Sequence, residues 1–545
     1  MELLWHIQHG TDTDAQTIFS RLREGDDPSA ILGPLGTKAQ RENASTESAA
    51  VPHSRPLHTH TKQHIDLATS DKLIGHPDLS DSATLSATLR SQGDVLTEAF
   101  SIFLKCTSSI FHVYTQEEVD ALLSKSLETD TQTPLSTLCE VCAVAAVGSR
   151  FSRSRISPEL GEYYSSVTKQ LLDECIEKTP LQAVKVCALL AMCNIINKAT
   201  AAFAYVELGL GVARIKGLLE RTPHAHMDHS IWLESKKVVK SLLACRGWLQ
   251  ATLSYIPETE PPVRLEDVDG GDQCCLDCED QTLYQTQVAR LTVIKAGIFQ
   301  QMRSIEFSKE SSEAIRLSLS QWLDQVPEHI RLENLGKPTV SPEAHISGLY
   351  LHSFYLGSRM LVYRWILSWI IQIRQEGIVP PPETKNESSR CADEGLIAAK
   401  ESVVTLWNIY EGGGAVRHCW LCIFQAYLSC CIILHDVLQR ALHGQSTAHL
   451  DNLELASRSL EVLAWTGQLD ATAKQYHASL SPIYALATSL SVQVGESSPN
   501  PANEHVHFRV TNGTSPLHDA ARKLSQMLYV ALKPEQERER TVSVY

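Results

Sequence analysis

The chain has 545 residues, of which 43% are hydrophobic and 20% charged, a globular composition long enough to bury a large core. Its formal net charge of −15 excludes a general electrostatic attraction to nucleic-acid backbones, so any such contact would have to be local. Several of its 15 cysteines lie in apolar helical stretches, where a thiol acts as a small hydrophobic group, and no disulfide framework is implied.

The N-terminal part is predicted to lie apart from the main body. Residues 1–33 indicate a short helical segment that ends at Gly33 and Pro34. The first residues lack the basic and apolar regions of a secretory signal, so a reducing compartment is expected. Residues 34–93 are rich in Ser, Thr, His, Asp and Pro and poor in apolar side chains, which predicts a flexible linker.

Residues 94–490 predict one large all-α domain. Apolar residues keep a helical period over several turns, for example at 314–326 and 341–373, whereas strand-like alternation is scarce. The stretch 160–220 indicates three successive helices with a break at Pro180, each with one apolar side to bury. The sequence therefore predicts an all-α, multi-helix fold.

The later connections are marked by proline and glycine. Residues 376–389 contain three successive prolines and residues 411–415 three glycines, and both are predicted as surface connections. Residues 491–515 predict a flexible loop, and 516–534 a C-terminal amphipathic helix.

The most apolar stretch, residues 419–438, approaches the length of a membrane span. It contains Gln425, His435 and Asp436, which are costly within a bilayer. We therefore expect a buried helix and no membrane contact.

The segment 222–230 contains an H-x-H-x-D-H string formed by His224, His226, Asp228 and His229. In metallo-β-lactamase-fold hydrolases this string follows a strand and binds one or two zinc ions together with ligands from later loops. Helices are expected on both sides of it here, so we predict no metal site, no catalytic residue and no cofactor. A metal-dependent hydrolase that uses these four residues remains the alternative hypothesis.

A second arrangement that could bind zinc comprises Cys274, Cys275 and Cys278 in an acidic stretch. A structural zinc site needs a second ligand pair, and the other C-x-x-C pairs, at 139–142 and 419–422, fall in apolar segments predicted as helices. The stretch is therefore interpreted as an exposed loop with reactive thiols.

Several segments, taken in order, resemble the middle homology region of the fungal zinc-cluster transcription factors. These segments are FSIFLKCTSSIFHVYTQEEVDALL (100–123), LLDECIEKTPLQAVKVCALLAMCNIINKATAAFAYVELGLGVARIKGLL (171–219), QWLDQVPEHIRL (321–332) and LHSFYLGSRMLVYRWIL (351–367). Residues 1–32 are similar to the short segment that follows the DNA-binding head in that family, so the resemblance covers nearly the whole chain.

The resemblance implies a nuclear transcriptional regulator of a fungal gene set, such as a secondary-metabolite biosynthetic cluster, rather than an enzyme. The family's six-cysteine zinc cluster is missing, since the first cysteine is Cys106. The expected partner is therefore a DNA-binding transcription factor or a second copy of the chain, with indirect DNA contact, unless the head is encoded upstream. A small-molecule effector in the helical core is also expected from the resemblance.

Overall fold

A computed structural model describes thirteen stretches of the chain, and its two compact units are 1–75 and 76–545. Every described residue belongs to the second unit, so the predictions for residues 1–33 and for most of the linker lie outside the described part. The described residues are 82–107, 110–128, 133–152, 156–195, 199–220, 222–224, 226–253, 280–304, 307–337, 340–412, 419–442, 450–493 and 515–529.

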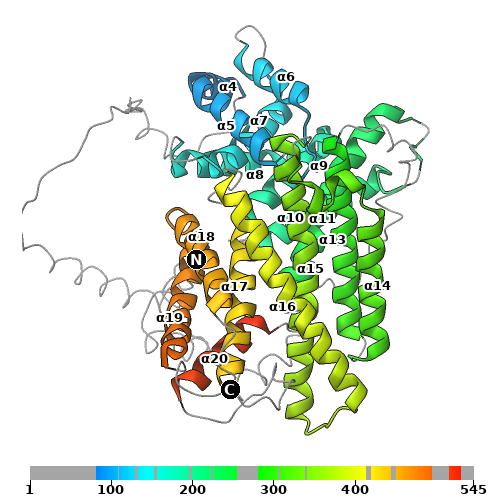
Figure 1. The fold of residues 1–545 in the computed structure, drawn as a ribbon. Helices are drawn as coiled ribbons and strands as arrows, with labels where there is room; N and C mark the ends of the chain where they lie inside the picture. Colours follow the sequence, from blue (N-terminus) through cyan, green and yellow to red (C-terminus); the bar gives the residue numbers. More distant parts are fainter. Residues whose placement is uncertain are drawn as a thin grey trace, which may run out of the picture. The chain divides into compact units, whose positions relative to one another are not determined.

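The described part is about 86% helical, with 16 α-helices and no strand, which confirms the predicted all-α fold (Figure 1). The first group consists of α4 (Ser82–Ser91), α5 (Gly93–Thr107), α6 (Gln116–Leu127), α7 (Leu135–Arg150), α8 (Pro158–Lys178), α9 (Pro180–Asn194), α10 (Ala199–Ile215) and α11 (His229–Leu253). The second group consists of α13 (Asp280–Ser304), α14 (Lys309–Gln325), α15 (Pro342–Gln375), α16 (Pro382–Glu411), α17 (Trp420–Leu442), α18 (Leu450–Thr466), α19 (Ala471–Gln493) and α20 (Pro516–Leu528), with short 3-10 turns at Glu328–Ile330 and Leu332–Asn334.

Local sequence signals set several of these helix boundaries. Thr115 and Glu118 form a capping box in which each side chain binds the backbone N–H of the other, and α6 begins directly after Thr115. Pro180 occupies the first turn of α9, where its missing N–H costs no helical hydrogen bond. The three helices expected within 160–220 are thus present as α8, α9 and α10.

Neighbouring long helices run antiparallel to each other and pack around a common core. α7 packs against α5, α8 and α9, and α15 lies beside α16 along most of its length (Figure 1). α7 approaches α5 so closely that a methyl group on Gly148 would lie 1.9 Å from the carbonyl oxygen of Ala99. A glycine is therefore required at this crossing.

α17 is the one helix of the described part that is long and apolar enough to cross a membrane by length and composition. The most apolar 18 residues of α17 are 94% buried, and the helix packs against α16, α18, α19 and α20. The predicted buried helix is confirmed.

The structure places two helices in stretches that the sequence predicts as connections. α4 lies within the predicted linker 34–93, and its Leu85 and Leu89, one turn apart, are buried in the core. α16 begins at Pro382, within the predicted loop 376–389, because the third proline occupies the first helical position, which tolerates it.

The C-terminal helix is shorter than the predicted 516–534. α20 ends at Leu528, and its Leu524 and Leu528 are fully buried against the body. The predicted loop 491–515 begins inside α19, which continues to residue 493, and the rest of that loop lies outside the described residues, apart from Ser515, the N-cap of α20.

A buried cationic centre as the candidate functional site

The H-x-H-x-D-H string follows α10 and ends at His229, the first residue of α11, and its acidic residue caps that helix. Asp228 Oδ1 accepts hydrogen bonds from the backbone nitrogens of Ser230 (2.8 Å) and Ile231 (3.3 Å) at the start of α11. A hydrogen bond from the Ser230 side chain, followed by the backbone bonds from Ser230 and Ile231, lowers the pKa of the Asp228 carboxyl. The carboxylate thus satisfies helix N–H groups that have no partner within the helix.

Two of the three histidines of the string, His224 and His229, lie against separate neighbours. His229 stacks on Trp232 with ring centroids 5.6 Å apart. His224 lies over Gly217, whose φ of +68° favours glycine, and a methyl group there would lie 1.9 Å from the imidazole. Within the described stretches, no group of three or more His, Cys, Asp or Glu side chains could hold a metal ion. Cys274, Cys275 and Cys278 lie outside those stretches.

Two buried cations meet where α11, α13 and α15 come together. Lys295 of α13 and Arg364 of α15 are only 3% and 7% exposed. Lys295 Nζ donates to Thr252 Oγ1 (3.3 Å), and Arg364 Nη1 donates to the carbonyl oxygen of the same residue (3.3 Å). Thr252, near the end of α11, therefore joins both cations, and we call this cluster the cationic centre.

The charges of the cationic centre lack a carboxylate counter-charge among the described residues. Burial, together with the nearby Arg364 guanidinium, lowers the pKa of Lys295 to about 7. Burial also lowers the pKa of Arg364 to about 10. A buried charge is normally paired, because its transfer from water is costly. The centre is therefore an electrostatically unfavourable arrangement that an anion would relieve.

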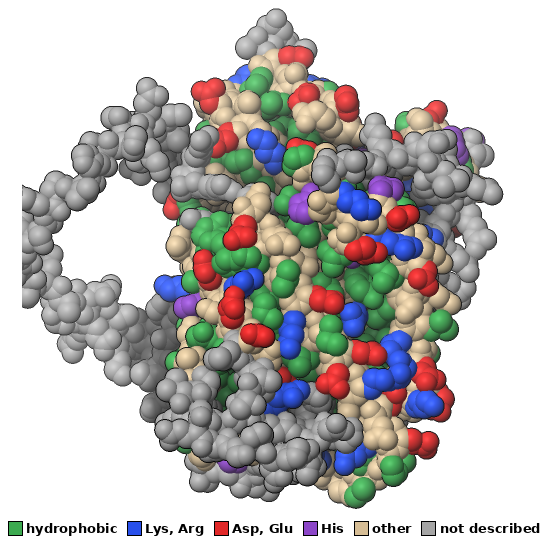
Figure 2. Space-filling view, in the orientation of Figure 1, with side chains coloured by type: hydrophobic (Ala, Val, Ile, Leu, Met, Phe, Trp, Pro, Cys, Tyr) green, Lys and Arg blue, Asp and Glu red, His purple; other side chains and the backbone are tan. Residues whose placement is uncertain are grey.

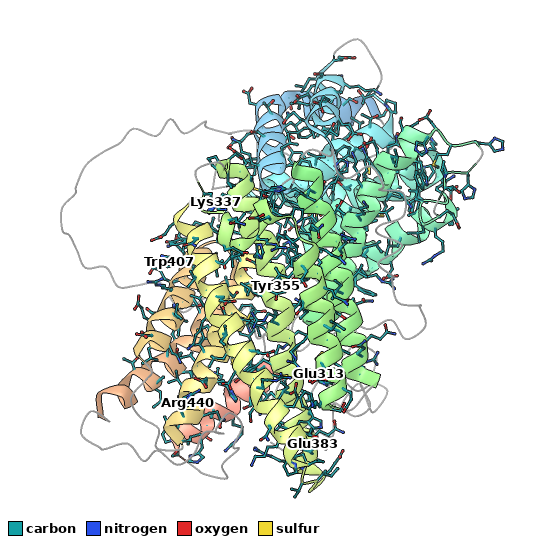
Figure 3. All side chains as sticks on the ribbon, turned by 45° about the vertical axis from the view of Figure 1, so that its right-hand side comes forward. Glu313, Lys337, Tyr355, Glu383, Trp407 and Arg440 are labelled. Carbon is teal, nitrogen blue, oxygen red and sulfur yellow. The ribbon has the colours of Figure 1, made fainter. Side chains whose placement is uncertain are left out.

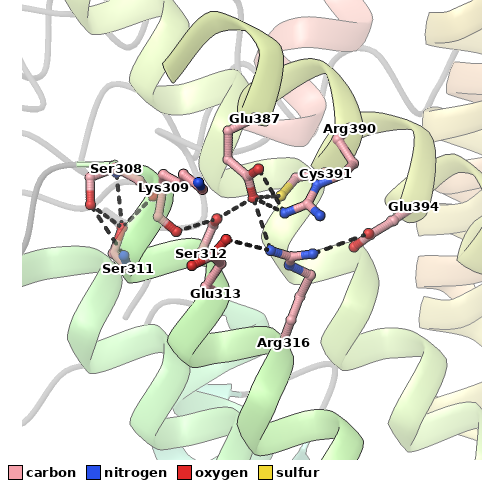
Figure 4. Close-up of polar contacts among 10 residues, drawn as sticks. All are labelled: Ser308, Lys309, Ser311, Ser312, Glu313, Arg316, Glu387, Arg390, Cys391 and Glu394. Atoms are coloured by element: carbon pink, nitrogen blue, oxygen red, sulfur yellow. Dashed lines mark hydrogen bonds and ion pairs between the residues drawn. The ribbon is translucent and has the colours of Figure 1, made fainter. Parts of the chain in front are cut away.

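Two other buried charges in the described part have partners of opposite charge. Asp436, 1% exposed, pairs with Arg440 at the C-terminal end of α17 (2.9 Å), and Arg440 is labelled in Figure 3. Glu387 of α16 binds Arg390 (2.6 Å) and Arg316 of α14 (3.2 Å), as Figure 4 shows. The cationic centre, with two cations side by side, differs from these paired charges.

The network around Glu387 joins α14 to α16. Besides the two arginines, the carboxylate accepts hydrogen bonds from the Ser312 hydroxyl and from the Cys391 thiol (3.4 Å), and Glu394 binds Arg316 from the next turn (3.7 Å) (Figure 4). Burial opposes ionisation of Glu387, but these donors outweigh it and lower its pKa. We assign the network a structural role, because its charges balance within it.

Gly357 and Gln425 complete the wall of the cationic centre. A methyl group on Gly357 would lie 2.6 Å from Gln425 Nε2 and 3.3 Å from Lys295 Nζ, so glycine lets both polar groups reach the backbone of α15. The Gln425 amide donates to the Ser353 carbonyl, and its oxygen accepts from the Ser402 hydroxyl (3.4 Å). α16 and α17 thereby contribute to the same polar interior.

The other side of Arg364 binds the C-terminal helix. Arg364 Nε donates to the Leu528 carbonyl oxygen (3.1 Å) at the end of α20, where the helix dipole favours a cation. Next to this contact, the Tyr363 hydroxyl binds His435 Nδ1 (2.9 Å), and His435 Nε2 binds the Ser525 hydroxyl of α20 (3.1 Å). These bonds fix the C-terminal helix beside the centre.

Two neighbouring cations attract a carboxylate or phosphate group. The N–H groups of Arg364 that do not donate to Leu528 and Thr252 could donate to such a group, and Lys295 supplies a point charge. Neither residue can be recognised from the sequence alone, because a single cation in a helical stretch usually faces water. The available signal was their apolar flanks, VIKAGIF around Lys295 and LVYRWIL around Arg364.

In comparison with known proteins, no protein-family model and no curated protein matches the chain. The fold and its buried centre define the class as an all-α, multi-helix protein.

Proposed function

We propose that the chain is a nuclear transcriptional regulator of a fungal gene set that acts through its helical body. A DNA-binding partner supplies the contact with DNA. The observation that carries the proposal is the order of the helices. α8, α9 and α10 follow one another without an intervening strand, and α14 and α15 come later, which is the order that the resembling segments imply.

The segment QWLDQVPEHIRL supports the proposal because it has a definite role in the fold. Trp322, 2% exposed, lies in the last turns of α14, and Ile330, fully buried, follows the break at Pro327. His352 Nε2 of α15 binds the Ile330 carbonyl oxygen (3.0 Å). The segment therefore connects α14 to α15 and helps to fix the position of one helix relative to the other.

The surface is consistent with indirect DNA contact. On the face drawn in Figure 2, the acidic and basic side chains of the described residues are interspersed rather than gathered by sign. Such a face offers little attraction for a phosphate backbone. A partner that reads DNA would then bring this protein to its target genes.

The cationic centre supplies the small-molecule part of the proposal. A small organic anion with a carboxylate or phosphate group binds at Lys295 and Arg364 and is the effector. Its binding changes the balance of charge where α11, α13, α15 and α20 meet, so it shifts the stability of the arrangement of these helices.

The experiment that tests the transcriptional role is chromatin immunoprecipitation of the tagged full chain, paired with a binding assay of the purified chain on the recovered DNA. Recovery from chromatin without binding by the pure chain supports a regulator that a partner tethers. Binding by the pure chain would replace the tethered mechanism with direct reading of DNA. No enrichment on chromatin would overturn the proposal.

The metal-dependent hydrolase remains the alternative proposal. It requires stoichiometric zinc in the purified chain and loss of that zinc in the His226→Ala variant. Metal analysis of both proteins decides it, and equal zinc content in the two rules out this site.

A further inference from the structure

A pair of thiols lies at the start of α17, and the structure gives the two cysteines different surroundings. Cys419 directly precedes the helix and is partly exposed, and its carbonyl oxygen accepts the hydrogen bond from Ile423 N (3.0 Å), which makes it the N-cap residue. Cys422, one turn later, is only 1% exposed, and its thiol donates to the Tyr350 hydroxyl of α15 (3.5 Å). The sequence predicts both cysteines inside one apolar helix, whereas Cys419 lies just before it.

The surroundings activate one sulfur and protect the other. Interaction with the Cys422 side chain is the largest cause that lowers the pKa of Cys419 to about 7. The backbone amides of Leu421 and Cys422 and the Tyr350 hydroxyl add to it, and burial opposes it. The same contact and burial raise the pKa of Cys422 well above its usual value. A thiolate at a helix N-terminus beside a protonated partner is the arrangement of a reactive C-x-x-C pair.

The position at the helix end also permits a bond between the two sulfurs. Residues three apart on a helix have Cβ atoms about 5–6 Å apart, whereas a disulfide needs about 3.5–4.5 Å. Cys419, as an N-cap residue, is not held in helical geometry and can close this gap. Cys139 and Cys142 have the same spacing but lie within α7, where closing the gap would break the helix.

We propose that Cys419 and Cys422 are a redox-active dithiol that reacts with small-molecule disulfides such as oxidised glutathione. The Cys419 thiolate attacks one sulfur of the glutathione disulfide and releases the other half as a thiolate, which takes up a proton. Cys422 then loses its proton and attacks the Cys419 sulfur, which releases the second glutathione as a thiol. Two protein thiols become one disulfide, and two electrons and two protons pass to two glutathione molecules.

Oxidation changes a contact between α15 and α17. A disulfide sulfur carries no proton, so Cys422 can no longer donate to Tyr350. Gln425, part of the cationic centre, lies one turn further along α17 on the same side as Cys422. Trp420, between the two cysteines, packs on Trp248 with ring centroids 4.3 Å apart, so the start of α17 is anchored in the core. The disulfide between Cys419 and Cys422 would therefore form at a helix end that is packed into the core.

The first test compares thiol reactivity within the full chain. Cys193 is also partly exposed, but burial raises its pKa to about 11. At pH 7 about half of Cys419 and about one in ten thousand of Cys193 is thiolate, so iodoacetamide should modify Cys419 at least a hundredfold faster. Equal rates at the two cysteines would overturn the proposal.

The second test follows the disulfide itself. The chain is equilibrated with oxidised and reduced glutathione, quenched by acid, and digested with chymotrypsin, which cleaves after Trp420, between the two cysteines, and after Phe424, before Cys430 and Cys431. The expected product is two peptides joined by a disulfide between Cys419 and Cys422 that dithiothreitol reverses, while Cys139 and Cys142 stay reduced.

Two variants separate the steps. Cys422→Ser should accumulate a glutathione adduct on Cys419, because the resolving thiol is missing, and Cys419→Ser should form neither adduct nor disulfide. Circular dichroism confirms that both variants keep the helical content of the parent. If Cys419 and Cys422 of the wild-type chain both remain free thiols under conditions that oxidise dithiothreitol, the redox role is refuted.

Discussion

Replacing Lys295 by methionine should make the protein more stable while removing its response to anions. Methionine has a similar length and carries no charge, so it fills the same space between α11, α13 and α15. It also removes the repulsion from Arg364. Such an outcome is expected for a functional charge that is retained at a cost in stability.

The size of the effect follows from the pKa of Lys295, which falls from 10.5 to about 7. Each pKa unit corresponds to about 1.4 kcal/mol, so protonated Lys295 lowers the free energy of unfolding by roughly 5 kcal/mol relative to the neutral amine. The variant loses the hydrogen bond to Thr252, worth about 1 kcal/mol. Replacement of buried charges by apolar residues has stabilised other proteins by about 1–4 kcal/mol, and we expect a gain in that range.

The pH dependence of the free energy of unfolding shows whether the Lys295 charge stabilises or destabilises the fold. The unfolded chain holds the Lys295 proton up to about pH 10.5 and the folded chain only up to about pH 7, so the unfolded state binds more protons in between and the wild-type stability rises with pH. Below pH 7 the full penalty applies. The advantage of Lys295→Met should therefore be largest at pH 7 and below, and should shrink towards pH 10.

The assay is urea unfolding at pH 6, 7, 8 and 9, with Lys309→Met, a change of an exposed lysine on α14, as the matched control. Inorganic phosphate, compared with sodium chloride at the same ionic strength, should stabilise the wild type and the control but not Lys295→Met; at a hundred times Kd the gain is about 2.7 kcal/mol. A variant that is less stable than wild type at pH 7, or an advantage that does not change with pH, would refute the assignment of a buried, uncompensated charge.

Three further substitutions test the packing. Glu387→Gln should cost about 1–3 kcal/mol in urea unfolding at pH 7, because two arginines lose their counter-charge; since the folded pKa is lowered, this contribution is present above about pH 4.5 and is lost as the pH falls through the folded value. Gly148→Ala should destabilise by about 1–3 kcal/mol or more, because its methyl group would overlap a carbonyl of α5, whereas Gly211→Ala, with open space around it, should be neutral or stabilising by up to about 1 kcal/mol in the same measurement. Gly357→Ala should reduce the stabilisation by phosphate at least several-fold with little loss of helical signal in circular dichroism, because the added methyl displaces the polar ends around Lys295.

The helices could be predicted where the apolar period is long. α15 begins and ends within two residues of the predicted 341–373, and α17 covers nearly all of the predicted buried stretch. The sequence does not predict α4, because only two leucines per ten residues mark its buried side and the surrounding Ser and Thr are typical of linkers. The proline run before α16 predicts a loop, although its last member is compatible with a first helical turn.

The candidate site could not be predicted, because its members come from distant parts of the chain. Thr252, Lys295 and Arg364 meet only through the packing of α11, α13 and α15, and each alone is ordinary in sequence. The histidine string illustrates the opposite case: it matches a metal motif in sequence, but in the fold Asp228 caps a helix. Proximity in sequence favours the string, whereas burial and charge in the structure favour the cationic centre.

The two proposed sites share α15 and α17. Tyr350 and Arg364 lie on α15, fourteen residues apart in sequence, and about 1.5 Å of rise per residue separates them by roughly 21 Å along that helix. Direct charge effects over that distance are largely screened. Any coupling between thiol oxidation and anion binding must therefore pass through the packing of α15 against α17, where Cys422 and Gln425 contact Tyr350 and Ser353. Measuring the stabilisation by phosphate in the reduced and oxidised chain would give that coupling directly, and equal values would show that the two sites act independently.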